Sequence, residues 1–163
     1  MKKTLIWIAS AILLLISGTT PIHAKSDEHQ IAQMRVVLAK YNSPMLGLED
    51  VLISAAQKYG LDWTLMAAIA GTESSFARRM PHECINPYGW GIYGDNKLCF
   101  ASIEDSIEGV ASGLAKKYNI SSIESIARTY NKVNTQAWIS HTSFFMRKIK
   151  TAQIPVSALP ITL

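Results

Sequence analysis

The sequence has no cluster of lysine and arginine residues with interleaved aromatic side chains, the pattern typical of a nucleic-acid-binding surface. The formal net charge is only +4, and the densest basic stretch, Arg147-Lys148-Lys150, is typical of a helix end. Nucleic acid is therefore not an expected partner, and the weak positive charge suits a protein that works near an anionic surface. No internal repeat and no low-complexity stretch is present, so the 163 residues predict one domain.

Long apolar runs are also missing. The run at residues 5–16 falls short of the ~20 residues that a comfortable membrane span takes. A basic start precedes this run and the small residue Ala24 follows it, which is the order of a secretory signal peptide. Residues 1–24 are therefore expected to be cleaved off, with retention as a membrane anchor as the alternative. No cysteine lies near the run, which argues against a lipoprotein anchor.

Cleavage after Ala24 would leave 139 residues with a formal charge of +2. A chain of this length buries about two-thirds of its unfolded surface, which is enough for an apolar core. We expect a folded domain over residues 25–151 and a loose tail over residues 152–163, where no periodicity remains. The expected product is an exported monomer, located in the periplasm or outside the cell, without a stable membrane span.

Cysteine is scarce, and Cys84 and Cys99 are 15 positions apart. An exported chain meets an oxidising compartment, so a disulfide between them is expected. The alternative is a metal site of His82, Glu83 and Cys84, but three adjacent residues match no standard ligand spacing. Neither a metal nor a cofactor is therefore expected.

Helical periodicity runs through nearly every segment from Glu28 to Lys150. Pro44 ends the first such segment and Gly60 ends the second. The apolar positions of the successive predicted helices are Ile31, Met34, Leu38 and Tyr41; Leu48, Val51, Leu52, Ala55, Ala56 and Tyr59; Leu65, Met66 and Ile69; Ile103, Ile107, Val110, Ala111, Leu114 and Tyr118; Ile123, Ile126, Ala127 and Tyr130; and Trp138, His141, Phe144 and Phe145. The pattern predicts a small all-α domain.

Polar residues mark three of the predicted helix starts. Asp62 is expected to cap the third helix. Ser102 with Asp105, and Ser121 with Glu124, resemble capping boxes for the two helices that follow the loop.

The stretch from Arg78 to Phe100 interrupts the helical pattern with two prolines and three glycines. It predicts one long loop, with room for a short β-hairpin, and a loop of this length in a compact domain usually has a function. Its residues Tyr88, Trp90 and Tyr93 offer flat apolar faces with a polar edge, which suit sugar rings. Packing of one or two of these rings against the core is the alternative.

Glu73 lies four residues after Ile69 and eight after Leu65, so on a helix its carboxylate continues the apolar stripe. Poor solvation of the charge, together with the negative end of the helix dipole, would raise the pKa of this carboxyl. A carboxyl group that stays protonated near neutral pH is what glycoside cleavage needs to protonate the leaving oxygen. A solvated glutamate at a fraying helix end is the alternative.

The surroundings of Glu73 resemble the lytic transglycosylase family, which has the goose-type lysozyme-like fold. The similar segments are AQKYGLD at 56–62, LMAAIA at 65–70 and ESSF at 73–76. Glu73 matches the sole catalytic acid of the family's E-S-x-F motif, Ser74 its serine and Phe76 its aromatic residue. Tyr130-Asn131 resembles the family's later Y-N element, whose tyrosine points at the active site.

The loop departs from that family, whose pattern has G-L-M-Q after the glutamate. Gly91-Ile92-Tyr93 stands in its place, without the glutamine. Residues 86–94 are similar instead to the N-x-F-G-I-K-G element of the endo-β-N-acetylglucosaminidase family, and residues 100–106 resemble the segment that follows it. Both families share a lysozyme-like core and the bacterial wall as substrate, so the departure concerns the bond and the product more than the substrate class.

The remaining tryptophan and histidine side chains can be placed from the helical pattern alone. Trp63, Trp138 and His141 lie on periodic helices and are expected in the core, and His29 is expected at the surface. The candidate substrate-binding residues are Ser74, Tyr88, Trp90, Tyr93, Tyr130 and Asn131.

The resemblance implies a glycosidase that cleaves peptidoglycan between N-acetylmuramic acid and N-acetylglucosamine, with Glu73 as general acid and then base. A transglycosylase would use the sugar's own primary hydroxyl, whereas a glucosaminidase-type hydrolase would activate water. Asp95, Glu83 and Asp105 are the candidate second carboxylates for the hydrolase. Tyr130 is a candidate hydrogen-bond partner of Glu73 or of the substrate's acetamido group. A non-catalytic peptidoglycan-binding module and a helical interaction protein are the alternatives of other classes.

Overall fold

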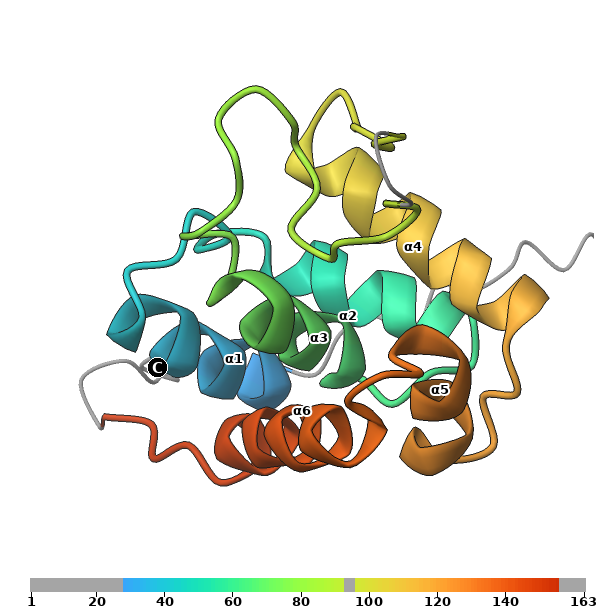
Figure 1. Cartoon of the computed structure of the whole chain (residues 1–163). Coiled ribbons are helices and arrows are strands. Elements are labelled where there is room, and N and C mark those ends of the chain that lie inside the picture. Colours follow the sequence, from blue (N-terminus) through green and yellow to red (C-terminus); the bar gives the residue numbers. More distant parts are fainter. Residues whose placement is uncertain (1–27, 93–95, 156–163) are drawn as a thin grey trace, which may run out of the picture.

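The computed structural model describes residues 28–92 and 96–155, which fold into six helices (Figure 1). They are α1 (Glu28–Lys40), α2 (Glu49–Lys58), α3 (Leu65–Ser74), α4 (Ile103–Lys117), α5 (Ile123–Tyr130) and α6 (Thr135–Lys150). These residues contain no strand, so the predicted all-α class is confirmed. None of the six helices combines the length and the apolar character that crossing a membrane takes. The predicted signal peptide, residues 1–24, and residues 156–163 of the predicted tail lie outside the described residues.

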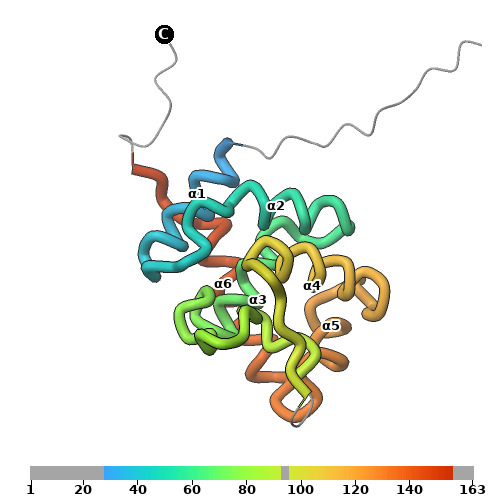
Figure 2. The backbone as a smooth tube through the Cα atoms, turned by 90° about the horizontal axis from the view of Figure 1, so that it is seen from above, coloured from blue at the N-terminus to red at the C-terminus, as the bar shows by residue number. Residues whose placement is uncertain are grey.

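Helix α3 lies in the middle of the molecule, with α6 packed along it and with α1 and α5 on opposite sides (Figures 1 and 2). Eight of its ten residues are buried, as expected of a helix that is apolar on nearly every side. Gly71 permits the close packing, because a Cβ atom there would lie 2.8 Å from the Phe76 ring and 3.0 Å from Phe145. The central helix is therefore held on all sides before it reaches Glu73.

The predicted helix caps are partly correct. Ser102 Oγ accepts the Asp105 N–H at 3.0 Å and caps α4 as predicted. The cap of α5 is Ser122, which accepts a backbone N–H from Ser125, so the prediction of Ser121 is wrong by one residue. The reason is that the Asn119 side chain accepts the Ser121 N–H at 3.0 Å and holds this residue in the preceding turn.

The third predicted cap, Asp62, acts slightly earlier than expected. Its Oδ1 accepts the Thr64 N–H at 2.9 Å and the Thr64 hydroxyl at 2.6 Å. Thr64 is the residue that precedes α3, and its own side chain caps nothing. Asp62 therefore stabilises the turn that leads into the helix.

The long loop between α3 and α4 is closed by a disulfide between Cys84 and Cys99, which confirms the predicted bridge. Beside the disulfide, the Phe100 N–H donates to the Ile85 carbonyl at 2.9 Å. This is an isolated antiparallel bridge between Ile85 and Phe100. The loop is therefore tied at its base by one covalent and one hydrogen bond.

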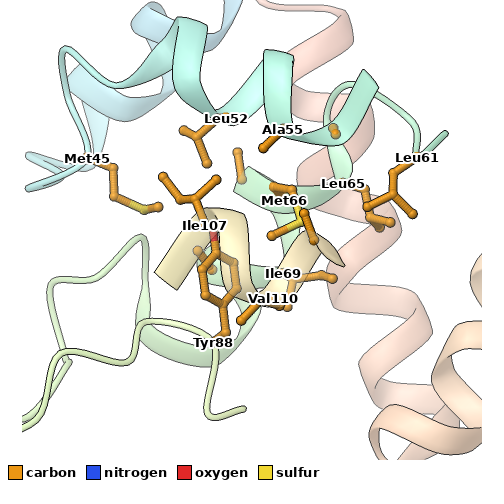
Figure 3. Packing of buried hydrophobic residues seen from close by; sticks show 14 of the residues in the cluster. Met45, Leu52, Ala55, Leu61, Leu65, Met66, Ile69, Tyr88, Ile107 and Val110 are labelled. Carbon is orange, nitrogen blue, oxygen red and sulfur yellow. The ribbon is translucent and has the colours of Figure 1, made fainter. Parts of the chain in front are cut away.

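Inside the loop, Asn86 and Tyr88 fix the backbone. Asn86 Nδ2 lies 2.7 Å from the carbonyl oxygens of both Trp90 and Leu98, and its Oδ1 accepts the Trp90 N–H at 3.1 Å. Tyr88 is fully buried and packs beside Ile107 of α4 (Figure 3). Tyr88 therefore anchors the loop in the core, and the Asn86 side chain provides hydrogen-bond partners for backbone groups of the loop.

The buried residues of α6 differ from the predicted set. Trp138, Thr142 and Ile149 are buried, which confirms Trp138 as a core residue. His141 is exposed, so its predicted core position is wrong. It comes one residue before Thr142, and one residue turns about 100° around a helix, which carries His141 off the buried face. Trp63 is half-buried.

Candidate active site

Glu73 is the second-last residue of α3, and its side chain meets α6. The indole Nε1 of Trp138 donates to Glu73 Oε1 over 2.7 Å. The hydroxyl oxygens of Thr72 and Thr142, from the same two helices, lie 3.1 Å apart. These two polar contacts fix the register of α3 against α6 at the position of the carboxyl.

The chain leaves α3 through a left-handed turn. Ser75, Phe76 and Ala77 have φ angles of 53°, 58° and 66°, a region that costs a residue other than glycine roughly 1–2 kcal/mol. The Phe76 side chain is fully buried, with its ring centroid 4.8 Å from that of Tyr41 and 4.9 Å from that of Phe145. Burial of this aromatic side chain offsets the backbone strain and ends the helix directly after Glu73 and its neighbour.

The Ser74 hydroxyl joins the end of α3 to the loop. Its Oγ lies 2.7 Å from the Pro87 carbonyl oxygen and 3.0 Å from that of Ala70, and it accepts the Ala77 N–H at 2.9 Å. The side chain is buried, so the structure places Ser74 under the site instead of on its surface. Its role here is to hold Pro87, and with it the next loop residues, near Glu73.

Gly89 is the loop residue that lies against the carboxyl. A Cβ atom at this position would lie 3.4 Å from Glu73 Oε2, and the φ of +59° also favours glycine. Among the described residues the carboxyl has one hydrogen bond, at Oε1, so Oε2 keeps its hydrogen-bonding capacity for a ligand. The two oxygens of Glu73 thus have different surroundings.

The pKa of the Glu73 carboxyl is raised above its ordinary value. Burial, which removes water from the charged form, is the larger cause, and the hydrogen bond from Trp138 partly offsets it by stabilising that form. The side chain nevertheless keeps an exposed surface. The carboxyl is therefore accessible from solvent and yet biased toward its protonated state.

A groove of about 310 Å³ lies beside Gly89, between the loop and the ends of α4 and α5. Its lining residues are Gly89, Trp90, Gly91, Ile92, Tyr118, Thr129, Tyr130 and Lys132. Aromatic faces, exposed backbone and a single lysine in one groove suit a ligand that has flat apolar faces and polar edges.

Four aromatic rings, from the loop, the residue after α4, α5 and α6, form a row that we call the aromatic row. The centroid distances are 5.2 Å from Tyr118 to Trp90, 5.7 Å from Trp90 to Tyr130 and 4.9 Å from Tyr130 to Trp138. Trp90 packs so closely on α4 that a Cβ atom at Gly113 would lie 2.6 Å from its ring. The row leads from the groove to the residue that binds Glu73.

Tyr130 and Asn131 hold the backbone around the site. The Tyr130 hydroxyl donates to the Tyr88 carbonyl at 2.7 Å and not to Glu73. Burial, and next the negative charge of Glu73, raise the pKa of Tyr130 well above its ordinary value, so this hydroxyl stays protonated. Asn131 Oδ1 accepts the Asn134 N–H at 2.8 Å and shapes the turn before α6.

Three of the predicted substrate-binding side chains are therefore away from the ligand space. Tyr88 is fully buried, while Ser74 and Asn131 bind backbone groups. Trp90 and Tyr130 do line the groove. Only these two of the predicted six have both a described position and a face toward the groove.

The structure describes only two of the three candidate second carboxylates. Asp95 lies outside the described residues, as does Tyr93. Glu83 and Asp105 are exposed, and neither is among the causes that shift the pKa of Glu73. In the part of the chain that the structure describes, no group of three or more histidine, cysteine, aspartate or glutamate residues is placed to hold a metal ion.

Trp138 and Gly89 are the two site residues that the sequence did not indicate. Trp138 was predicted to be buried, but the periodicity of α6 says nothing of a partner 65 positions earlier. Gly89 was one of several loop glycines in the sequence. The role of Trp138 depends on how α6 packs against α3, and the role of Gly89 depends on the path of the loop.

A larger cavity of about 560 Å³ lies at the other end of α3. It touches Leu65 at the start of that helix, Ile123 of α5 and Met146 of α6. None of the predicted site residues lines it, so the groove beside Glu73 remains the candidate site.

The sequence matches no family model, no curated protein and no solved structure. The features that point to a function are therefore the short motifs around Glu73 and the geometry of the residues that surround it.

Proposed function

We propose that the protein is a peptidoglycan-cleaving glycosidase of the lytic transglycosylase type, with Glu73 as its general acid and base. The observation that carries the proposal is the state of the Glu73 carboxyl. Its pKa is raised by burial, one of its oxygens is held by Trp138, and the other lies toward Gly89, which lines a groove with aromatic side chains. The alternative interpretation, a solvated glutamate at a fraying helix end, fits the exposed surface of Glu73 but not its raised pKa or its hydrogen bond from Trp138.

The first step is cleavage of the β-1,4 bond between N-acetylmuramic acid and N-acetylglucosamine. Glu73 gives its proton to the glycosidic oxygen as the bond to that oxygen breaks. The positive charge that develops on the sugar is shared with the acetamido group of the substrate. Glu73, now a carboxylate, removes a proton from the sugar's own primary hydroxyl, which closes the anhydro ring.

The groove supplies the binding surface for the glycan strand. Trp90 and Tyr130 add aromatic side chains to its wall, which suit sugar rings, and Gly89 and Gly91 let the strand approach the backbone closely. Lys132 adds a positive charge at the edge of the groove, which suits an anionic wall polymer.

A glucosaminidase-type hydrolase on the same glycan is the second candidate, favoured by the likeness of residues 86–94 to that family. It would use water as the nucleophile and a second carboxylate such as Asp95. Within the described residues, burial and Trp138 are the causes that shift the pKa of Glu73, and a second carboxylate is not among them. Asp95 lies outside the described residues, so the order of the two candidates rests on the E-S-x-F motif around Glu73.

Export to the wall is part of the proposal. The order of residues 1–24 supports a signal peptide, and the disulfide between Cys84 and Cys99 supports folding in an oxidising compartment.

The test is digestion of purified peptidoglycan with the secreted protein, followed by mass spectrometry of the released fragments. Anhydro-muramic ends are expected. Reducing ends would replace the transglycosylase by the hydrolase. Binding to the wall without release of fragments would favour a non-catalytic module and would refute the enzymatic proposal.

A further inference from the structure

The Glu73 carboxyl and the Trp138 indole form an asymmetric pair. An indole N–H is a donor only, and it lies 2.7 Å from Oε1. Oε2 faces Gly89, a residue that lines the groove. One oxygen is therefore occupied by a fixed donor inside the protein, while the other lies toward Gly89 on the wall of the groove.

We propose that Trp138 is a positioning residue that keeps the acid proton of Glu73 on Oε2, on the side of the groove. A protonated carboxyl group has a single O–H, and its other oxygen remains an acceptor. Because the indole N–H needs a lone pair on Oε1, the proton belongs on Oε2. In its catalytic meaning, this inference rests on the proposed function.

Every proton and electron pair of the cleavage step can then be assigned to an atom. The O–H bond at Oε2 breaks, and its proton forms a bond to the glycosidic oxygen. The bond between that oxygen and the sugar carbon breaks, and its electron pair stays with the departing oxygen. Glu73 becomes a carboxylate, and the hydrogen bond from Trp138 becomes charge-assisted and stronger. The indole thus orients the acid before the step and stabilises the base after it.

Trp138 is held firmly enough for this role. Its side chain is 2% exposed, and its ring centroid lies 4.9 Å from that of Tyr130. The Tyr130 hydroxyl is itself bonded to the backbone of the loop, at the Tyr88 carbonyl. A donor confined in this way fixes the carboxyl before a ligand arrives, so no reorientation accompanies the reaction.

The first experiment follows the proton of Glu73 directly, by NMR of the whole secreted protein with ¹³C-labelled glutamate and ¹⁵N-labelled tryptophan. In the unmodified protein, the Trp138 Nε1–H resonance should shift with the same midpoint as the Glu73 carboxyl. Trp138→Phe keeps a buried aromatic ring but removes the donor, so the Glu73 pKa should rise further.

Trp63→Phe is the matched control, because Trp63 is half-buried and lies outside the site, and it should leave the Glu73 midpoint unchanged. Benzothienylalanine at position 138 replaces the N–H by sulfur in a ring of the same shape, and it decides the question if Trp138→Phe does not fold. An unchanged Glu73 midpoint in both position-138 variants would overturn the proposal.

The second experiment measures activity on purified peptidoglycan. Trp138→Phe should lower kcat about tenfold or more with little change in KM, and the decline of the rate at high pH should move to higher pH. A purely structural role would reduce the amount of active protein without moving that decline.

The two proposals can fail separately. If the unmodified protein releases no wall fragments, the proposed function fails, and the NMR titration still decides where the indole acts. If Glu73→Gln abolishes release while Trp138→Phe changes neither kcat nor the pH of the decline, the positioning role fails and the function stands.

Discussion

Trp138 and Glu73 are 65 positions apart in the sequence and share a hydrogen bond of 2.7 Å between Nε1 and Oε1. The bond joins α6 to the last turn of α3, where the chain also leaves the helix through a left-handed turn. A raised pKa together with this indole contact distinguishes Glu73, which keeps an exposed surface, from Glu49, whose side chain is buried and paired with Arg35. The proposed chemistry depends on that distinction.

Glu73→Gln should abolish release of wall fragments, with a fall of at least about 100-fold, because an amide has no proton to give. The amide oxygen can still accept the Trp138 N–H, so the melting temperature should change little. Glu104→Gln, at an exposed glutamate in the first turn of α4, is the matched control and should keep full activity. Undiminished fragment release by Glu73→Gln would refute the catalytic role.

Activity should decline as pH rises through the pKa of Glu73, because the acid step needs the protonated form. The midpoint should lie above the ~4.3 of an exposed glutamate, since burial raises the pKa of this group. The same shift also makes stability depend on pH. Because the folded state binds the proton more tightly than the unfolded state, the stabilisation that Glu73 contributes is lost as pH rises through its raised pKa. Rate profiles, and melting curves of the unmodified protein and Glu73→Gln over pH, measure both effects; a rate that increases throughout this range would contradict the assignment.

Gly89→Ala should reduce activity more than stability. The new Cβ atom would lie on the wall of the groove, 3.4 Å from Glu73 Oε2. Gly60→Ala is a close control, because Gly60 has a similar φ of +69° and no atom within 4 Å of the new Cβ. Both variants should lose about 1 kcal/mol of stability to backbone strain. Equal activities in the two variants would show that the space beside Oε2 is not used.

The protein should contain no free thiol, since Cys84 and Cys99 are bonded to each other. Replacing both by serine should lower the free energy of unfolding by about 3 kcal/mol, the value for a closed loop of this length. Thiol titration of the denatured, unreduced protein and urea unfolding provide the two measurements. Two titratable thiols would contradict the bridge.

Features set by neighbouring residues were predictable from the sequence. The helices follow from apolar spacing, and the cap of α4 follows from Ser102 and Asp105 three positions apart. The error at α5 is of the same local kind: two adjacent serines are both suitable caps, and the Asn119 side chain decides between them.

Features set by distant contacts were not predictable. Tyr88 was expected to bind ligand, but the path of the loop carries its ring into the core beside α4. The Tyr130 hydroxyl was expected near Glu73 and is bonded instead to the backbone of that loop. Trp138 was correctly placed in the core, yet burial alone gave no sign of its carboxyl partner. Each of these depends on how segments tens of residues apart come together.

The left-handed turn at Ser75, Phe76 and Ala77 implies that the native sequence is not at its stability maximum. Ala77 has a φ of 66°, where glycine is unstrained, so Ala77→Gly should raise the free energy of unfolding by about 1 kcal/mol in urea denaturation. A loss of stability would mean that the backbone strain is already relieved elsewhere. If the expected gain is seen without loss of activity, the turn is a place from which the protein can be made more heat-tolerant without touching its catalytic groups.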